Sequence, residues 1–219
     1  MPRSKRLLHP EFPHHITARS NNRVHFPVSL EIAWSIFEDH LYLLNRGFGC
    51  EIISFVLMPN HFHLMLRDPN LQLGSAMQYF MRETSKEINR QAGTINRVWG
   101  ANYYSSLISN LPYYYSAYKY VYRNPVKAGL CTSTISYPFS TLCGLLGASR
   151  ISIPLNEDPT LFDNVEDTLS WLDEGFSETE ERAIGLSLRR PKMIYSVDPI
   201  TRKAIEPTGL LTHPRYRKV

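Results

Sequence analysis

The chain has 219 residues, of which 43% are apolar and 12% aromatic, enough to fill one hydrophobic core and to carry a small appended unit. Its formal net charge is only +4, and its three cysteines contain no Cys-x-x-Cys pair, which argues against a disulfide framework or a zinc-thiolate site. The longest apolar runs are far too short to span a membrane and the basic N-terminus lacks a following apolar core, so we expect a cytoplasmic protein.

The predicted elements alternate between strands and helices over the first two thirds of the chain. Apolar runs of strand length predict strands over residues 14–20, 50–57, 61–67 and 102–108, with the second and third adjacent and antiparallel. Ser29 is a suitable cap for a helix over 30–45, and apolar residues at helical spacing predict a second helix over 72–91. The residues expected on the buried sides of these two helices are Ile32, Ile36, Leu43 and Leu44 in the first, and Leu73, Met77, Phe80, Met81, Thr84 and Ile88 in the second.

Two histidines, His61 and His63, stand one residue apart at the start of the third predicted strand. Because side chains alternate between the faces of a strand, both imidazoles point to one face, while Phe62, Leu64 and Leu66 point to the other. Two imidazoles on one face form a bidentate metal site. Two histidines at this spacing also occur as ordinary half-exposed strand residues, so a second feature of the sequence is needed to favour a metal site.

A tyrosine-rich segment provides that feature. Asn110 is a suitable helix cap, Pro112 suits a first helical turn, and Pro125 disfavours helical geometry at the residue before it, which predicts a helix over 112–124. Within this helix Tyr120 and Asn124 are four residues apart and share a face. The tyrosines two positions to either side face away, so only Tyr120 can work beside a group held by Asn124.

The chain resembles the REP-associated tyrosine transposases, a branch of the HUH single-tyrosine transposases that act on single-stranded DNA. The resemblance rests on "FVLMPNHFHLML", which contains the two histidines, and on "YVYRNPVKAGL", which begins at Tyr120. Weaker matches at 14–23, 95–108 and 137–142 extend it over residues 13–146 in the expected order. Ser20 and Asn102 depart from the family pattern, where Gly and Arg are often found, and these departures bear on DNA recognition.

The resemblance implies a single-strand DNA endonuclease and strand transferase that acts on hairpin DNA of the REP type. It assigns Tyr120 as the nucleophile that forms a 5′-phosphotyrosine intermediate, and His61, His63 and Asn124 as ligands of a divalent cation. Two imidazoles and one amide oxygen leave coordination positions for water and phosphate, which fits Mg²⁺ or Mn²⁺ better than zinc.

The resemblance also implies a ferredoxin-like or RRM-like α+β sandwich, which the order of predicted elements matches. We expect a central antiparallel sheet of four to five strands with helices packed on one face, formed by residues 1–147. Residues 148–219 are expected to form a helical C-terminal extension with a basic tail, including helices over 163–176 and 178–190. We expect a monomer rather than a homodimer, because REP-associated relatives tend to be monomers and the extension is long.

The charges are unevenly distributed. Residues 1–155 hold 15 Lys and Arg against 8 Asp and Glu, whereas residues 156–181 hold 10 acidic residues and no basic one. The basic region suits a phosphate-backbone partner, although proteins that never bind DNA often have a similar excess. The acidic helices can either cover a basic DNA-binding face and inhibit it or form a solvated appendage, and we favour the second.

Several basic and amide side chains are candidates for DNA contacts, and each has a plainer explanation. The basic residues of the second helix also fit a solvated face balanced by glutamates, and those of the first loop also fit a polar turn. The aromatic residues Trp99, Tyr103, Tyr104 and 113–115 can stack on bases or pack in the core. The candidate DNA contacts are Arg19, Asn21, Asn22 and Arg23 in the first loop, Arg82, Lys86 and Arg90 on the second helix, and Arg123 and Lys127 beside the tyrosine.

Two other classes of function remain compatible with these residues. One is a nucleic-acid-binding protein of RRM-like fold without catalysis, such as a decayed transposase, and the other is a metal phosphodiesterase that uses water as its nucleophile. The co-occurrence of both histidines, Tyr120 and Asn124 favours the transposase over both alternatives.

Overall fold

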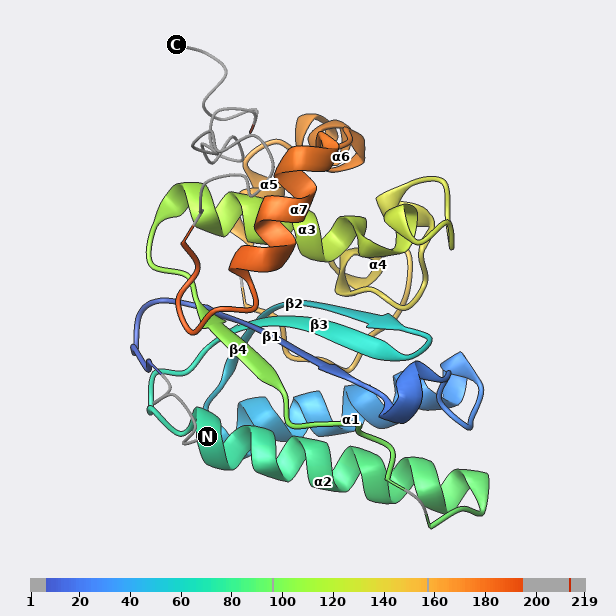
Figure 1. Ribbon diagram of the computed structural model, residues 1–219. Coiled ribbons are helices and arrows are strands. Elements are labelled where there is room, and N and C mark those ends of the chain that lie inside the picture. The colour runs from blue at the N-terminus through green and yellow to red at the C-terminus, as the bar shows by residue number, and fades with distance from the viewer. Residues whose placement is uncertain (1–6, 96, 157, 195–212, 214–219) are drawn as a thin grey trace.

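Four strands form one antiparallel sheet in the computed structural model, which describes residues 7–95, 97–156, 158–194 and 213 (Figure 1). The strands are β1 (His14–Arg19), β2 (Glu51–Met58), β3 (His61–Arg67) and β4 (Tyr104–Leu107), in the order β2-β3-β1-β4. Because β3 pairs with both β1 and β2, the strand that carries the histidines lies inside the sheet. The fold is the α+β sandwich that the sequence predicts.

Two long helices, α1 (Leu30–Phe48) and α2 (Leu73–Ala92), cover one face of the sheet (Figure 1). Ser29 caps α1 as predicted, since its hydroxyl accepts a hydrogen bond from the Ile32 N–H. Two predicted core positions in α1 are wrong, because Ile32 is 42% and Leu43 40% exposed. At about 100° per residue the buried stripe is centred on Phe37 and Leu44, and the two exposed residues lie roughly 110–130° from its centre. The core residues predicted for α2 are buried, apart from the partly buried Met81.

The opposite face of the sheet is also covered, which corrects the expectation that helices pack on one face only. The helix α3 (Leu111–Lys127) crosses β2 and β3 on this face, and its Tyr118 and Val121 share a core with Val56 and Met65 (Figure 1). Both strands are buried along almost their whole length, and a strand that is apolar on both faces needs cover on both sides. The run "IISFVLM", which is apolar except for Ser54, carries this signal in the sequence.

The tyrosine helix continues through Pro125 to Lys127 and does not end at Asn124 as predicted. Proline lacks the N–H that would bond the Val121 carbonyl, but the Ala128 N–H still donates to the Asn124 carbonyl. Pro125 is itself buried, so tertiary packing overrides the local preference of the residue before a proline. The start of the helix agrees with the prediction, with Asn110 as its cap.

The C-terminal helices pack on the outer side of α3, and not as the solvated appendage that we favoured (Figure 1). Trp171 and Leu172 are fully buried and Ile184 is 2% exposed, all in the same core as Val121, because these helices pack apolar residues against α3. Whether residues 1–147 fold as a separate domain stays a prediction, and the predicted basic tail lies outside the described residues apart from His213. The remaining helical segments are η1 (Asn21–Arg23), η2 (Thr134–Ser136), α4 (Thr141–Leu145), α5 (Pro159–Phe162), α6 (Val165–Asp173) and α7 (Glu178–Ser187).

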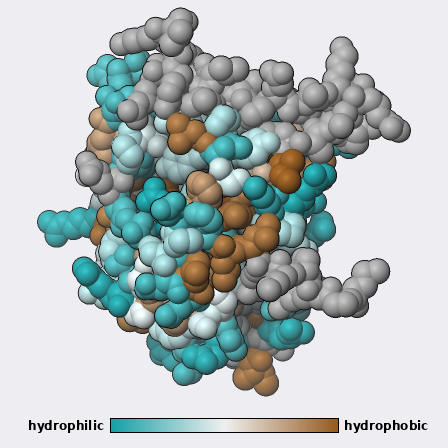
Figure 2. Space-filling model, turned by 90° about the vertical axis from the view of Figure 1, so that its left-hand side faces the viewer, coloured by the Kyte–Doolittle hydropathy of each residue, from teal (hydrophilic) through white to brown (hydrophobic). Residues whose placement is uncertain are grey.

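On the molecular face shown in Figure 2, hydrophobic residues form small groups among hydrophilic ones, as is usual for protein surfaces. No helix among the described residues is both long enough and apolar enough to cross a membrane.

Candidate active site

A pocket of about 570 Å³ opens on the α3 side of the sheet, between the strands β1 and β3, the helix α3 and the end of α7. The side chains that the sequence singled out for chemistry all line it. These are His61 and His63 from β3 and Tyr120 and Asn124 from α3. The fold therefore brings together residues that lie far apart in the chain.

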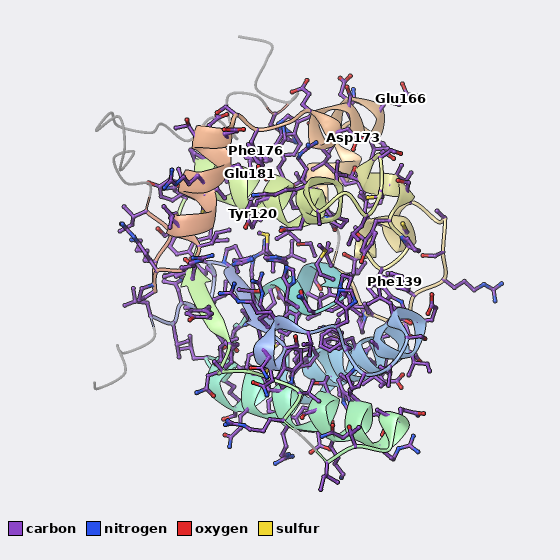
Figure 3. The ribbon with its side chains drawn as sticks, turned by 45° about the vertical axis from the view of Figure 1, so that its right-hand side comes forward. Tyr120, Phe139, Glu166, Asp173, Phe176 and Glu181 are labelled. Atoms are coloured by element: carbon purple, nitrogen blue, oxygen red, sulfur yellow. The ribbon has the colours of Figure 1, made fainter. Side chains whose placement is uncertain are left out.

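The two histidines face Tyr120 across the pocket. His61 and His63 lie on the same face of β3, with ring centroids 5.1 Å apart, as strand alternation predicts. The ring of Tyr120 lies edge-on to that of His63 at 5.7 Å between centroids. In Figure 3, Tyr120 projects from α3 toward the sheet, and the acidic side chain of Glu181 lies above it on α7.

Asn60 determines which nitrogen of His61 carries the proton. Its Nδ2 donates a 2.7 Å hydrogen bond to the Arg23 carbonyl, which turns its Oδ1 toward His61. That oxygen lies 2.7 Å from Nδ1 of His61 and can only accept, so the proton sits on Nδ1. The Nε2 lone pair of His61 is then free to bind a cation.

Burial keeps the histidines of the pocket uncharged. Loss of solvent lowers the pKa of His61 to about 4, and the nearby Arg19 guanidinium acts in the same direction. The pKa of His63 is held well below its ordinary value, also by burial first and then by its histidine neighbours. A neutral imidazole is the form that binds metal ions, so both residues are ready ligands at neutral pH.

The side chain of Asn124 is hydrogen-bonded to the backbone of Tyr120. Its Nδ2 donates a 2.7 Å hydrogen bond to the Tyr120 carbonyl, which leaves Oδ1 as the atom available to the pocket. The amide is held rigidly, since the residue is only 9% exposed. An oxygen donor one helical turn beyond the tyrosine therefore faces the same pocket as the two imidazoles.

The donor chemistry of these three residues fits a divalent cation. No group of three or more His, Cys, Asp or Glu side chains suited to a metal occurs in the described part of the chain. The predicted ligands include only two side chains of these types, His61 and His63, and the third ligand is the amide oxygen of Asn124. Two neutral imidazoles and one amide oxygen leave several coordination positions to water and phosphate oxygens.

Tyr120 has a partly buried hydroxyl between opposing charges. Burial raises its pKa, and the Glu181 carboxylate raises it further, whereas Arg189 and Arg19 lower it. A side chain built on Gly185 of α7 would begin 3.5 Å from the tyrosine oxygen, so α7 forms a wall of the site. Sequence reasoning missed this contribution, because residues 178–190 show a helical pattern but no motif.

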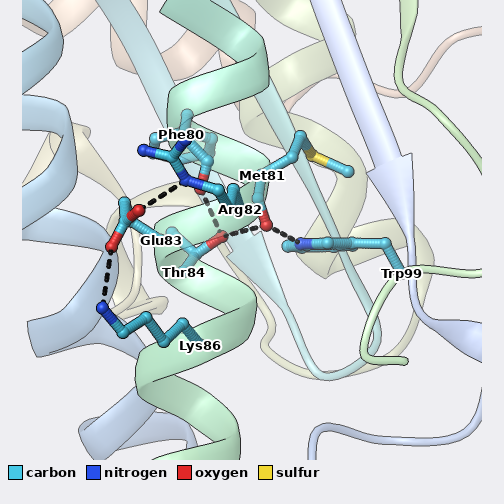
Figure 4. Close-up of polar contacts among 7 residues, drawn as sticks. All are labelled: Phe80, Met81, Arg82, Glu83, Thr84, Lys86 and Trp99. Carbon is cyan, nitrogen blue, oxygen red and sulfur yellow. Dashed lines mark hydrogen bonds and ion pairs between the residues drawn. The ribbon is translucent and has the colours of Figure 1, made fainter. Parts of the chain in front are cut away.

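The first loop also lies where the sequence suggested. Arg19 from β1 and the three residues of η1 line the pocket, and Asn22 and Arg23 adopt the left-handed backbone that lets the loop turn tightly here. Among the aromatic candidates, Tyr104 is 57% exposed and lines the pocket, whereas Trp99 is 7% exposed. The indole of Trp99 donates to the Met81 carbonyl, so it serves packing (Figure 4).

Other predicted DNA contacts lie away from the pocket. Arg123 donates hydrogen bonds to the carbonyls of Leu172 and Asp173, and Lys127 forms a 3.2 Å ion pair with Glu181. Both cations beside the tyrosine therefore anchor the C-terminal helices. The remaining three predicted contacts, which we call the basic stripe of α2, lie across the sheet from Tyr120 and are paired with glutamates, as a solvated face would be. They are Arg82, Lys86 and Arg90, paired with Glu83 and Glu87. Figure 4 shows Glu83 between Arg82 and Lys86.

Comparison with known proteins supports the class that fold and site define. The model of the family "Transposase IS200 like" matches residues 11–124, more than half of the chain, so this protein belongs to the IS200-like transposase family. Among curated proteins, the REP-associated tyrosine transposase of Escherichia coli (strain K12) is 30% identical over 91 residues, which are 42% of this chain and 53% of the relative. The chain thus spans about half the length of this relative.

The fold comparison points the same way. The solved structure of a REP-associated tyrosine transposase bound to a REP hairpin matches with a TM-score of 0.56 and 19% identity, covering 81% of this chain and 96% of the other. At this identity the match shows a shared fold. The resemblance seen in the sequence is confirmed.

Proposed function

We propose that this protein cleaves and rejoins single-stranded hairpin DNA through a covalent bond to Tyr120, with a divalent cation held by His61, His63 and Asn124. The observation that carries the proposal is the pocket that these four side chains share, with the tyrosine ring 5.7 Å from that of His63. The solved relative is bound to a REP hairpin, which supports hairpin DNA as the substrate class.

The reaction exchanges one phosphodiester bond for another. The phenolate of Tyr120 attacks the phosphorus and forms a 5′-phosphotyrosine bond, while the bond to the 3′ oxygen breaks and that oxygen leaves as a 3′-hydroxyl after taking up a proton. A bound Mg²⁺ or Mn²⁺ would supply Lewis-acid polarisation of the phosphate oxygens. A DNA 3′-hydroxyl that attacks the same phosphorus reverses the step and releases the tyrosine, so no nucleotide cofactor is needed.

The pocket offers means to activate the phenol. A tyrosine hydroxyl is protonated at neutral pH, and burial makes the Tyr120 phenolate still harder to form because it raises the pKa of the hydroxyl. Arg19 and Arg189 act against this shift and line the same pocket, so they can stabilise the phenolate and bind the phosphate that it attacks. Arg189 lies beyond the segment that matches the family model and would be a contribution of the C-terminal helices.

Unpaired DNA would lie along the first loop and β4. Arg19 and Arg23 offer charge to the phosphates, and the amides of Asn21 and Asn22 offer hydrogen bonds. The exposed ring of Tyr104 at the pocket edge can stack on a base. We propose a monomer as the active form, because Tyr120 already lies beside the histidines of its own chain.

Labelled hairpin oligonucleotides provide the test. Incubation with Mn²⁺ or Mg²⁺ should give a protein band that carries the label from the cleaved 5′ end, and Tyr120→Phe should abolish it. Tyr113→Phe, at a tyrosine of the same helix that does not line the pocket, should retain the band.

The same assay separates the two other classes of function. A water-dependent phosphodiesterase would still cleave with Tyr120→Phe and release a free 5′-phosphate. A binding protein without catalysis would retain the oligonucleotide after metal removal and form no covalent product with any variant. Either result would end the proposal.

A further inference from the structure

A third histidine, His15, contacts His63 at the proposed cation site. It lies on β1 and is 1% exposed, and its Nε2 is 2.9 Å from Nδ1 of His63. The two rings are stacked, with centroids 5.2 Å apart and planes inclined by 29°. The contact runs diagonally across the β1–β3 pair, where Thr17 is the direct partner of His63.

Only one proton can lie between two neutral imidazole nitrogens at this distance. If His15 donates it, His63 must hold its own proton on Nε2, and that nitrogen cannot bind a cation. If His63 donates it, Nε2 of His63 is a bare lone pair. Because Nδ1 of His63 is occupied by His15 in both cases, the direction of this one hydrogen bond decides whether His63 can act as a ligand.

The neighbouring ligand shows which direction the site needs. His61 holds its proton on Nδ1, since Oδ1 of Asn60 can only accept, and so presents Nε2. His63 matches this pattern only when His15 is the acceptor. Metal-binding histidines usually donate their second N–H to an acceptor such as a carboxylate, a backbone carbonyl or water, which fixes the ring and its tautomer, and here a neutral imidazole nitrogen would take that place.

Within the part of the chain that the structure describes, His63 is the hydrogen-bond partner found for the buried His15 ring. Its Nδ1 is buried and has no hydrogen-bond partner among the described residues. A buried polar atom without a partner is costly and uncommon in folded proteins, and an apolar ring of the same shape would avoid that cost. The contact with His63 is thus what distinguishes a histidine from a phenylalanine at this position.

We propose that His15 is a positioning residue of the cation site, which accepts a hydrogen bond from Nδ1 of His63 and thereby holds Nε2 of His63 as a lone pair toward the cation. This inference rests on the proposed function, because it concerns the same ligands. It adds a residue that lines the same pocket, with its ring centroid 6.4 Å from that of Tyr120, and that acts on the cation through His63.

Mn²⁺ affinity of the full chain, measured by electron paramagnetic resonance of the free ion, tests the inference. His15→Phe should weaken Mn²⁺ binding by about 10–100-fold, the usual effect of losing such a partner. His15→Gln, whose side-chain oxygen can accept the same hydrogen bond, should recover most of the loss. The matched control is His14→Phe, a fully buried histidine on the same strand that bonds Ser105 and not His63, and it should leave Mn²⁺ affinity unchanged.

Nitrogen-15 spectra of the histidines in the unmodified protein give a readout that does not depend on any variant. In the presence of saturating Mg²⁺, His63 should carry its proton on Nδ1 and His15 should have a bare Nε2. A proton on Nε2 of His15 in that state would overturn the inference, and so would an unchanged Mn²⁺ affinity of His15→Phe. If the unmodified protein binds no Mn²⁺ at all, the proposed function fails together with the inference.

Discussion

The hydrogen bond between Tyr118 and Asp158 ties the C-terminal helices to α3, and its removal should destabilise the protein measurably. The Tyr118 hydroxyl donates to Oδ2 of Asp158 at 2.6 Å, and both residues are buried. The other carboxylate oxygen, Oδ1, accepts the N–H groups of Thr160 and Leu161 at the start of α5. Tyr118→Phe keeps the shape of the ring but leaves Oδ2 of Asp158 buried without its hydroxyl donor.

A hydrogen bond to a charged group contributes about 1.5–3 kcal/mol, so we expect Tyr118→Phe to lower the free energy of unfolding by about this amount. For a chain of this length that corresponds to a decrease in Tm of roughly 3–12 °C. Urea and thermal unfolding followed by circular dichroism measure both quantities. Tyr42→Phe, on the exposed surface of α1, should change neither.

The cost of Tyr118→Phe should also depend on pH. Burial raises the pKa of Asp158, and the hydrogen bond from Tyr118 opposes that shift, so its loss raises the pKa of the folded state further. A carboxyl whose folded pKa is raised above its unfolded value destabilises the protein increasingly as pH rises through that window. The difference between variant and unmodified protein should therefore be smaller in acid than at neutral pH. A difference below about 0.5 kcal/mol at neutral pH, within the range of ordinary surface substitutions, would refute this account of the tether.

Three further predictions concern the pocket. Gly185→Ala should be tolerated, because a Cβ would meet the Tyr120 oxygen at an ordinary 3.5 Å. Gly185→Leu should displace the tyrosine ring and abolish the covalent DNA adduct without unfolding the chain. If Gly185→Leu forms the adduct at the normal rate, the Tyr120 ring does not react from this position. Glu181→Gln should lower the pKa of Tyr120, because the Glu181 carboxylate raises that pKa. The pH profile of adduct formation should therefore move to lower pH. An unchanged profile would exclude electrostatic coupling between Glu181 and Tyr120. Arg19→Ala should weaken binding of single-stranded DNA and reduce its salt dependence, as measured by fluorescence anisotropy titration. Alanine at all three positions of the basic stripe of α2 should change binding little. The reverse order of effects would show that DNA binds to the other face of the protein.

The local parts of the site could be predicted because they depend on backbone period alone. Alternation along a strand is enough to turn His61 and His63 to one face, and the helical repeat is enough to put Asn124 one turn beyond Tyr120. The caps Ser29 and Asn110 accept hydrogen bonds from N–H groups three residues away, so they too can be predicted from the local sequence. The error at the end of α3 arose where a local preference, that of the residue before Pro125, was outweighed by burial.

The sequence by itself determined the class of protein, the order of its strands and helices, and the residues that carry the proposed chemistry. Only the tertiary structure decided that α7 closes the pocket over Tyr120, that Arg123 and Lys127 are engaged by the C-terminal helices, and that His15 lies behind His63. These contacts join segments distant in the chain, and they depend on strand register and on which apolar faces meet. Periodicity within one element says which way a side chain points, but the partner it finds there is selected by the packing of the other elements.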